Sequence, residues 1–282
     1  MADTNRTILV TGATGKQGGA LIDELIGKEW NLRAMTRHTD GDAARKLRGA
    51  GLQVVYGDLD DPPSLRAALD GVWGVFGVQN TWEAGVEREE EQGKRLAQLA
   101  RDAGVQHYVY ASVGSAQRNT GIPHFENKWR VEETVRSLNF PSYVIYRPVF
   151  FMENLTTPWF LNGNAIYSAL APTTVLQMIA VSDIGKYAAR AFTDAEQLNG
   201  RSFDIAGDAK TMPQAAEILG RAFGRNITYV QIPLEDVRKN SEDFAIMLDW
   251  FNRVGYDADI DGIAREFGIA PTRLEDWARR AV

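Results

Sequence analysis

The sequence predicts an α/β protein: a Rossmann-type, doubly wound parallel sheet with a smaller C-terminal α+β domain. The stretch from Ile8 to Gly19 reads ILVTGATGKQGG, in which a buried apolar strand passes through three glycines into an amphipathic helix. Apolar strands and helical segments then alternate over the first half of the 282 residues, which is typical of a parallel sheet with right-handed crossovers. The second half is less regular and carries aromatic clusters and prolines at Pro158 and Pro172.

The elements of the predicted sheet follow the glycine turn in order. Its further strands are Asn31–Thr36, Val54–Tyr56, Val72–Val78, His107–Ala111 and Tyr143–Tyr146. The helices are a segment from near Pro63 through Leu65–Leu69, the long Glu83–Ala103, Lys128–Leu138, and Ser182–Phe192 with Ser182 or Asp183 near its cap. Phe203–Ala206 could return as one more strand. Residues 1–149, joined by 182–207, are therefore the predicted nucleotide-binding domain, and 150–181 with 208–282 the smaller substrate or interaction domain.

Charge and composition exclude several classes of function. The formal net charge of −6 leaves no basic footprint for nucleic acid. The absence of cysteine excludes disulfides, thiolate catalysis and cysteine metal sites, and we predict no metal site. The N-terminal MADTNRT has no apolar signal core and no run is long enough to span a bilayer, so we expect a cytoplasmic protein without a membrane partner.

The glycine turn predicts an anion site. Gly12, Gly15 and Gly18 let the backbone turn sharply and let a pyrophosphate approach, and the first amides of the following helix point at the ligand. Thr14, Lys16 and Gln17 belong to the same loop. The spacing is G-x-x-G-x-x-G rather than G-x-G-x-x-G, and the alternative is an ordinary tight turn between strand and helix.

The residue after the second strand selects the dinucleotide. Arg37 stands there, where an acidic residue would favour NAD, and a guanidinium suits the 2′-phosphate of NADP. His38 and Arg33 could add charge, and the alternative for Arg37 is a solvated surface arginine. Asp58 and Leu59, after the third strand, would flank the adenine. Gln79 and Asn80, after the fourth strand, would lie beside the nicotinamide ribose. The alternative for Asp58 is a turn or helix-start aspartate.

Candidate catalytic residues follow the fifth strand. Ser112 ends that strand, His124 comes twelve residues later and Lys128 four after that. Short-chain dehydrogenases carry Ser and then Tyr-x-x-x-Lys, so His124 stands in the place of the tyrosine. Histidine donates a proton well only when charged, and the Lys128 ammonium would disfavour that form. His124 is therefore more readily a pocket wall or a hydrogen-bond donor to substrate than an acid, and the alternative to a catalytic role is a loop histidine before a helix. Lys128 needs only charge and reach to hold the cofactor.

Aromatic side chains near strand ends are candidates for an apolar pocket over the nicotinamide. They are Phe150, Phe151, Trp82 and Trp159, with Phe150 also a candidate cofactor contact. For Phe160 and Trp250 a place in the core is the favoured interpretation. The acidic run Glu87–Glu91 is interpreted as a solvated helix face.

The motifs together resemble the NmrA-like group of atypical short-chain dehydrogenases, and within it the HSCARG (NmrA-like family domain-containing) branch. They are TGATGKQGG, MTRH, GDLDD, VQNTW, EQGKRLAQLARDAGV, HFENKWRVEE, YRPVFFMENL and VSDIG, spread over nearly the whole chain. The resemblance implies a Rossmann-type domain that binds NADP(H), often without the catalytic tyrosine. By motif match it implies cofactor contacts at Gly12, Thr14, Gly15, Gly18, Arg37, Lys128 and Asn154.

Two departures from that branch bear on the cofactor. The branch carries more basic residues after the arginine, whereas this chain reads HTDGDAARK with Asp40 and Asp42, which puts the strength of NADP preference in doubt. The branch also carries a lysine just before QGK, where this chain has Glu91.

Two functions follow as hypotheses. One is an NADPH-dependent reductase of quinones, enones or related small carbonyl compounds, motivated by Ser112, Lys128 and the aromatic candidates. The other is a non-catalytic redox sensor that acts through a protein partner, as some members of the resembled group do. An epimerase or lyase is weaker because Tyr-x-x-x-Lys is missing. We leave a homodimer open.

Overall fold

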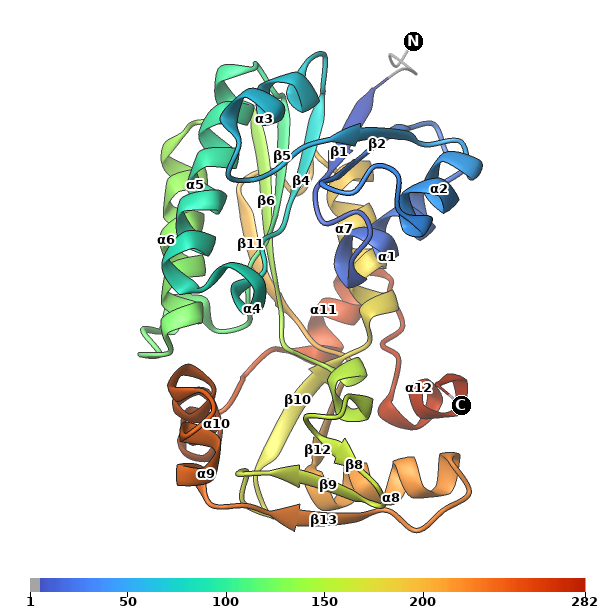
Figure 1. The fold of residues 1–282 in the computed structure, drawn as a ribbon, viewed down its shortest axis with the longest axis vertical. Helices are drawn as coiled ribbons and strands as arrows, with labels where there is room; N and C mark the ends of the chain where they lie inside the picture. The colour runs from blue at the N-terminus through green and yellow to red at the C-terminus, as the bar shows by residue number, and fades with distance from the viewer. Residues whose placement is uncertain (1–5, 282) are drawn as a thin grey trace. The chain divides into compact units, whose positions relative to one another are not determined.

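The computed structural model describes residues 6–281, which divide into two compact units. Unit 1 comprises the chain up to Ser112 together with Asn127–Tyr146 and Ile184–Phe203. Unit 2 comprises Val113–Glu126, Arg147–Asp183 and the chain from Asp204 onward. The segment Val113–Glu126, assigned above to the nucleotide-binding domain, thus groups with unit 2. Figure 1 shows the helices and strands of both units.

A seven-stranded sheet forms the centre of unit 1, in the order β11-β6-β5-β4-β1-β2-β3. The strands are β1 (Thr7–Val10), β2 (Asn31–Thr36), β3 (Gln53–Tyr56), β4 (Gly74–Gly77), β5 (His107–Ala111), β6 (Ser142–Pro148) and β11 (Arg201–Ile205). The neighbouring pairs from β6 to β3 are all parallel. The predicted Rossmann-type sheet is confirmed, and the return of a strand around Phe203 places β11 at its edge beside β6.

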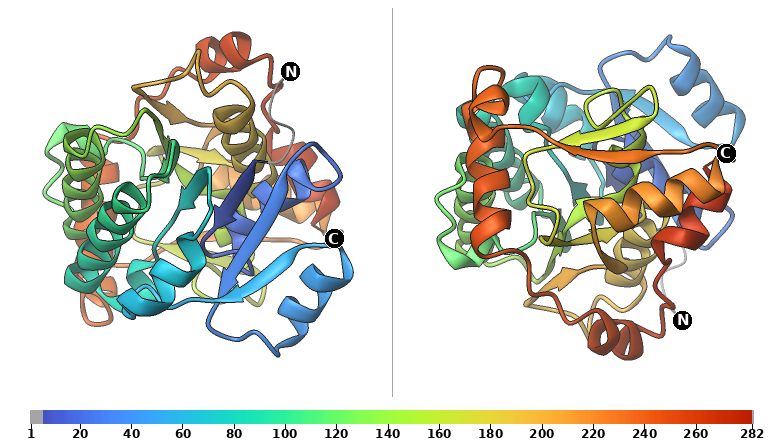
Figure 2. Two further views of the ribbon diagram at one scale, coloured as in Figure 1. Left: turned by 90° about the horizontal axis from the view of Figure 1, so that it is seen from above. Right: turned by 90° about the horizontal axis from the view of Figure 1, so that it is seen from below.

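Helices cover both faces of this sheet (Figures 1 and 2). They are α1 (Lys16–Leu25), α2 (Asp42–Gly49), α3 (Pro62–Leu69), α4 (Thr81–Ala84), α5 (Val86–Asp102), α6 (Pro123–Ser137) and α7 (Val181–Thr193). On one face, α3, α5 and α6 bury a cluster around Leu65, Leu96 and Val131 against the sheet. On the other face α7 lies close to α1, since a Cβ on Gly185 would come within 2.4 Å of the Ala20 carbonyl oxygen.

Several predicted boundaries need correction. The helix predicted as Glu83–Ala103 is two helices, because Gly85 has a φ of 83° that ends α4 and begins α5. Strand β4 is shorter than Val72–Val78. Helix α6 begins at Pro123, five residues before Lys128. Helix α7 begins at Val181, so Ser182 and Asp183 lie within its first turn. The Asp183 carboxylate accepts hydrogen bonds from the Thr272 amide at 2.6 Å and hydroxyl at 2.9 Å.

Unit 2 combines two small sheets with helices. One sheet contains β7 (Phe150–Phe151), β10 (Val175–Ile179) and β12 (Asp208–Thr211), and the other β8 (Leu161–Asn162), β9 (Ala165–Ser168) and β13 (Thr228–Gln231). The helices are α8 (Met212–Ala222), α9 (Leu234–Arg238), α10 (Glu242–Arg253), α11 (Ile260–Phe267) and α12 (Leu274–Arg280), with the short 3-10 turns Ala116–Arg118 and Met152–Thr156. Phe160 and Trp250 lie in the apolar core of this unit, which confirms their predicted place.

Two observations concern membrane spans and metal sites in residues 6–281. Within that range no helix is long and apolar enough to cross a membrane. The same residues bring together no group of three or more His, Asp or Glu side chains that could hold a metal ion.

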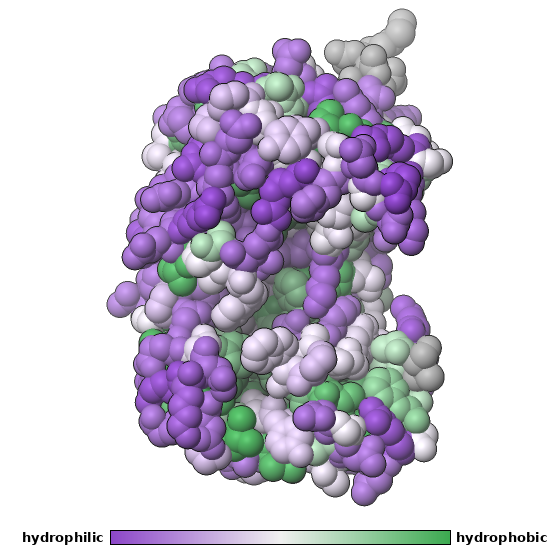
Figure 3. Space-filling model, viewed as in Figure 1, coloured by the Kyte–Doolittle hydropathy of each residue, from purple (hydrophilic) through white to green (hydrophobic). Residues whose placement is uncertain are grey.

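The surface of α5 is hydrophilic in the view of Figure 3, where the helices of unit 1 present polar side chains. Glu87, Arg88 and Glu91 are exposed there, as the interpretation of a solvated acidic face expects. Glu89 departs from it, because only 1% of this residue is exposed. Its position is in phase with the buried Gly93, Leu96 and Ala100 of the same helix, so the helical period carries it inward.

Candidate functional site

The glycine turn between β1 and α1 has no room for a Cβ at Gly12 or Gly18. Gly12 has a φ of +58°, and a Cβ there would lie 2.9 Å from Val78 Cγ1. A Cβ on Gly18 would lie 2.3 Å from the Gly12 carbonyl oxygen, so this glycine lets α1 start against the strand it follows. Gly15 caps α1 without a side-chain hydrogen bond, and the backbone ladder of the helix begins with Gly19 N donating to Gly15 O at 2.9 Å. The leading amides therefore form the kind of helix start that binds anions.

The turn opens where the order of the strands reverses. β1 pairs with both β2 and β4, and the chain leaves β1 and β4 in opposite directions across the sheet. Thr11 fastens the two strand ends: its hydroxyl donates to Phe76 O at 2.9 Å and accepts from Val78 N at 2.9 Å. Such a switch point is where open parallel sheets bind ligands. Of the other loop residues, Thr14 and Lys16 are exposed and Gln17 accepts from the Tyr146 hydroxyl at 3.4 Å.

A buried carboxylate organises the residues around Lys128. Lys128 Nζ lies 2.6 Å from Glu89 Oε1, and Asn127 Nδ2 donates to Glu89 Oε2 at 2.8 Å. The Thr81 hydroxyl also donates to Oε2. Burial works against the charged carboxylate, but the Lys128 ammonium and the three hydrogen bonds hold the pKa of Glu89 below its ordinary value. Sequence reasoning identified Lys128 and missed Glu89, whose signal was its helical phase.

Several buried polar atoms at the carboxyl ends of β4 and β5 and on α6 have no hydrogen-bond partner among residues 6–281. They are the two amide atoms of Gln79, Ser112 Oγ, Tyr110 Oη and Asn127 Oδ1. Gln79 is 6% exposed, and its Oε1 lies 3.2 Å from the position of a Cβ on Gly93, which places it against α5. Burial raises the pKa of Tyr110 well above its ordinary value, so this phenol stays neutral. Because unpaired buried polar atoms are costly, these groups are free to satisfy a ligand.

Arg37 makes an ion pair at the carboxyl end of β2. Its guanidinium donates to Glu83 of α4, and the two side chains are 48% and 52% exposed. Arg33 does not support it, because its guanidinium donates to Ala68 O and Asp70 O, both at 2.7 Å, at the end of α3. His38 is exposed and its amide donates to Thr36 Oγ1 at 3.2 Å.

Asp58 and Asn80 have roles in the local backbone. Asp58 Oδ1 accepts from the Asp60 amide at 2.9 Å, which is turn chemistry, and Leu59 is half-buried beside it. Asn80 Oδ1 accepts from the Trp82 amide at 3.2 Å and caps α4. Asp60, which sequence reasoning did not single out, links this turn to α5 through Gln92 at 2.7 Å and Arg88 at 2.8 Å.

His124 belongs to unit 2, in the first turn of α6. Its Nδ1 is ion-paired with Asp243 of α10, and its amide donates to Asp243 Oδ1 at 3.1 Å. Asp243 therefore caps the start of α6 as well as holding the imidazole. Sequence reasoning missed Asp243, because the two residues lie 119 positions apart and no motif joins them.

The remaining candidates differ in exposure. Phe150 lies in the core of unit 2, with its ring 5.3 Å from that of Phe160 in an edge-to-face contact. Phe151 and Asn154 are half-buried in the same unit. Trp82 of unit 1 is 61% exposed, and Trp159 of unit 2 is 81% exposed.

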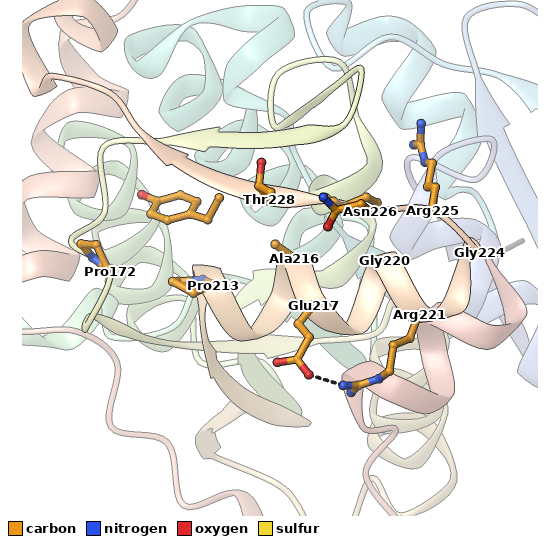
Figure 4. A pocket seen from close by; sticks show the side chains of 12 residues that line it. Pro172, Pro213, Ala216, Glu217, Gly220, Arg221, Gly224, Arg225, Asn226 and Thr228 are labelled. Atoms are coloured by element: carbon orange, nitrogen blue, oxygen red, sulfur yellow. Dashed lines mark hydrogen bonds and ion pairs between the residues drawn. The ribbon is translucent and has the colours of Figure 1, made fainter.

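A groove of about 740 Å³ lies in unit 2 between α8 and β13 (Figure 4). Its charged side chains already have partners. Arg221 donates to Glu217 at 2.5 Å and lies 3.6 Å from Glu275, while Arg225 donates to Asn164 Oδ1 at 3.3 Å. The arginines of the groove are thus already paired, in contrast to the unpartnered side-chain amide of Gln79 in unit 1.

Comparison with known proteins places the chain among named relatives. A model of the NmrA-like family matches residues 4–278. The NmrA-like family domain-containing oxidoreductase FrzB of Cladobotryum sp is 34% identical over 52% of this chain, and the match spans about half of that relative (47%). The nitrogen metabolite repression protein nmrA of Emericella nidulans is 27% identical, covering 95% of this chain and 77% of its own. The NAD(P)H azoreductase of Xenophilus azovorans is 30% identical, covering 82% and 79%.

Solved structures share the fold. NmrA, a negative transcriptional regulator crystallised in complex with NAD, is 23% identical with a TM-score of 0.82, covering 98% of this chain and 95% of its own. Its complex with NADP has a TM-score of 0.81 at the same identity and coverage. Citrobacter sp. triphenylmethane reductase complexed with NADP(H) is 20% identical with a TM-score of 0.81, covering 98% and 100%.

Proposed function

The chain belongs to the NmrA-like family, and from this premise we propose that it binds a nicotinamide dinucleotide, NADP(H) by preference, and uses NADPH to reduce small carbonyl compounds such as quinones or enones. The observation that carries the proposal is the glycine turn at the strand-order switch. Its crowded Gly12 and Gly18 and its uncapped helix start suit a pyrophosphate and little else.

The residues around the turn fit the rest of such a cofactor. Arg37 follows β2, where the adenosine ribose of a Rossmann-bound dinucleotide lies, and its guanidinium suits a 2′-phosphate. Gln79 and Ser112 follow β4 and end β5, and their unpartnered polar atoms suit the nicotinamide end. When bound, the nicotinamide supplies a hydride to an acceptor.

Lys128 is the binding cation of that end. Glu89 holds its ammonium from one side at 2.6 Å, which fixes the side chain, and leaves the other N–H groups for ribose hydroxyls. A positioned acceptor needs mainly proximity for hydride transfer, and water can supply the proton. His124, whose imidazole contacts Asp243 within unit 2, is a second candidate for the proton donor.

The names of relatives support both the proposed cofactor and the proposed reductase activity. One relative is named an NAD(P)H azoreductase, and one solved relative is a triphenylmethane reductase complexed with NADP(H). A redox sensor is the second candidate, because tyrosine is replaced by His124, and because NmrA is described as a negative transcriptional regulator. In that case the partner would be a regulated protein.

Nucleotide binding is tested by thermal-shift and calorimetric titration of the full chain with NADPH, NADP⁺, NADH and NAD⁺, since a ligand of the folded form raises the midpoint. We expect NADPH to bind most tightly, and Arg37→Glu to weaken NADPH far more than NADH. Equal losses for both would contradict the role of Arg37. No binding of any of the four would refute the proposal.

Activity is tested by following NADPH oxidation over a panel of quinones and enones. Turnover above background with at least one acceptor is expected for the reductase. Binding without turnover, together with a change in oligomeric state or partner capture between NADPH and NADP⁺, would favour the sensor instead.

A further inference from the structure

We propose that Glu83 competes with the 2′-phosphate of the dinucleotide for Arg37, and so sets how strongly the protein prefers NADP(H) over NAD(H). This inference rests on the proposed function. It starts from the ion pair between Arg37, directly after β2, and Glu83, the third residue of α4. The guanidinium that would bind the 2′-phosphate is already paired with the Glu83 carboxylate.

The pair is suited to exchange. Both side chains are about half exposed, at 48% and 52%, so the ion pair is held in water and contributes little to stability. A phosphate brings more charge than a carboxylate and matches a guanidinium bidentately, so it is the stronger partner. Displacing Glu83 leaves a carboxylate beside the phosphate, and that repulsion opposes binding of NADP(H) but not of NAD(H), which lacks the phosphate.

Three other arginines near Arg37 in the sequence already have partners. Arg45 donates to Asp42 and to Asp40 O, and Arg48 donates to Thr39 O at 2.6 Å. Arg33 is held at the end of α3 by Ala68 O and Asp70 O. The Asp42 carboxylate of HTDGDAARK thus already holds Arg45, one of the basic residues that follow Arg37.

The backbone fixes where Glu83 can reach. Asn80 caps α4 and Gly85, with a φ of 83°, ends it, so Glu83 sits on a single short turn anchored at both ends. Thr81 of the same turn donates to the buried Glu89. Because α4 is anchored, the carboxylate stays close to Arg37 even when the ion pair is broken.

The test is a set of dissociation constants for NADPH and NADH, measured calorimetrically for the wild type, Glu83→Gln, Glu87→Gln, Arg37→Gln and Glu83→Gln/Arg37→Gln. Glu87 is the matched control, since it is an exposed glutamate four residues on with no ion pair among the described residues. Adenosine 2′,5′-bisphosphate and adenosine 5′-phosphate serve as probes that carry the adenosine end alone.

We expect Glu83→Gln to tighten NADPH and the bisphosphate by about threefold to tenfold, and to change NADH and the monophosphate by less than about twofold. Glu87→Gln should not change the ratio of the NADPH and NADH dissociation constants from its wild-type value. In the Arg37→Gln background the gain from Glu83→Gln should vanish.

Three results would overturn the inference: equal gains for both dinucleotides, an equal gain from Glu87→Gln, or a gain that persists without Arg37. If the wild type binds NADPH and one of these results appears, only the competition is wrong. If the wild type binds none of the nucleotides, the proposed function fails and the inference fails with it.

Discussion

Two of the glutamate–cation pairs in unit 1, Arg37–Glu83 and Lys128–Glu89, differ mainly in burial. Arg37–Glu83 lies at the end of β2 with both side chains about half exposed, whereas in Glu89–Lys128 the two side chains are 2% and 12% exposed. Glu83 has a single cation as its partner, while Glu89 also accepts from Asn127 and Thr81. The first pair can exchange its carboxylate for a ligand, and the second fixes a cation in place.

The physical reason is the surrounding dielectric. In water an ion pair gains little and is replaced at small cost. In a buried site each partner has lost its hydration, so removing one leaves a charge that nothing compensates. We therefore expect a variant of Glu89 to affect folding, and a variant of Glu83 to affect ligand choice.

The largest expected effect is that of Glu89→Gln. Removing the charge leaves Lys128 without its counter-ion, and we expect the free energy of unfolding to fall by about 3 kcal/mol. Urea unfolding measures it, in a double-mutant cycle with Lys128→Met. Glu91→Gln, an exposed neighbour on the same helix, should cost under about 0.5 kcal/mol. Additive effects of the two single variants would show that Glu89 and Lys128 are not coupled.

As the pH is lowered, the first loss of stability is expected from a buried histidine, His107, and not from the two ion pairs. Its Nδ1 lies 2.9 Å from Ser142 Oγ and its Nε2 2.9 Å from Ala191 O, and burial lowers the pKa of His107 to about 4. The unfolded chain takes up a proton near pH 6.5, so stability is full above that pH and is lost as pH falls toward 4. The loss should reach about 3 kcal/mol.

The measurement is the free energy of unfolding at a series of pH values for the wild type and His107→Gln. In the variant, the free energy of unfolding should no longer fall between pH about 6.5 and 4. If it still falls in the variant, a group other than His107 causes the pH dependence. Glu89 and Asp60, whose carboxyl pKa values are lowered by their cationic and hydrogen-bonding partners against the effect of burial, contribute stability that is present above their ordinary pKa near 4. That stability is lost only as pH falls further, in a window below that of His107.

Gly18→Ala tests the glycine turn, where the pyrophosphate of the dinucleotide is proposed to bind. The two ends of the dinucleotide would extend from this turn toward Arg37 and toward Lys128. A Cβ there would lie 2.3 Å from the Gly12 carbonyl oxygen, so α1 must shift, and we expect a loss of about 1–3 kcal/mol together with weaker NADPH binding. Gly19→Ala is the matched control, because its Cβ would meet nothing nearer than 3.8 Å. Equal effects of the two variants on thermal midpoint and NADPH affinity would contradict the close approach at Gly18.

Much of the fold was readable from the sequence, because its signals are local. The glycine turn, the strands around Ile8, Ala34 and Val109, and the return near Phe203 follow from apolar runs, and the NmrA-like resemblance is confirmed as family membership. The closer likeness to the HSCARG branch stays a prediction. The helix break at Gly85 was not predicted, because it arises from the positive φ of this residue, which the sequence does not show.

The candidate site was less readable, because its second partners come from elsewhere in the chain. Arg37 and Lys128 were identified by their place after a strand and in a helix motif. Their carboxylates, Glu83 and Glu89, lie 46 and 39 residues away. Glu89 belongs to the run Glu87–Glu91 that the sequence assigns to solvent, and Glu83 precedes that run. Only the helical phase distinguishes Glu89 from its neighbours, and nothing in the sequence pairs Glu83 with Arg37.

The smallest expected effect is on the exposed pair itself, and it sharpens the comparison most directly. A double-mutant cycle of Glu83→Gln and Arg37→Gln should give a coupling energy below about 1 kcal/mol in 0.1 M salt. In 1 M salt, where the Debye length is about 3 Å, that coupling should vanish, while the coupling of Glu89 with Lys128 should persist because water and ions do not reach it. Urea unfolding of both cycles at the two salt concentrations makes the measurement. If the two couplings respond to salt alike, burial does not distinguish these pairs, and the division between an exchangeable and a fixed cation is wrong.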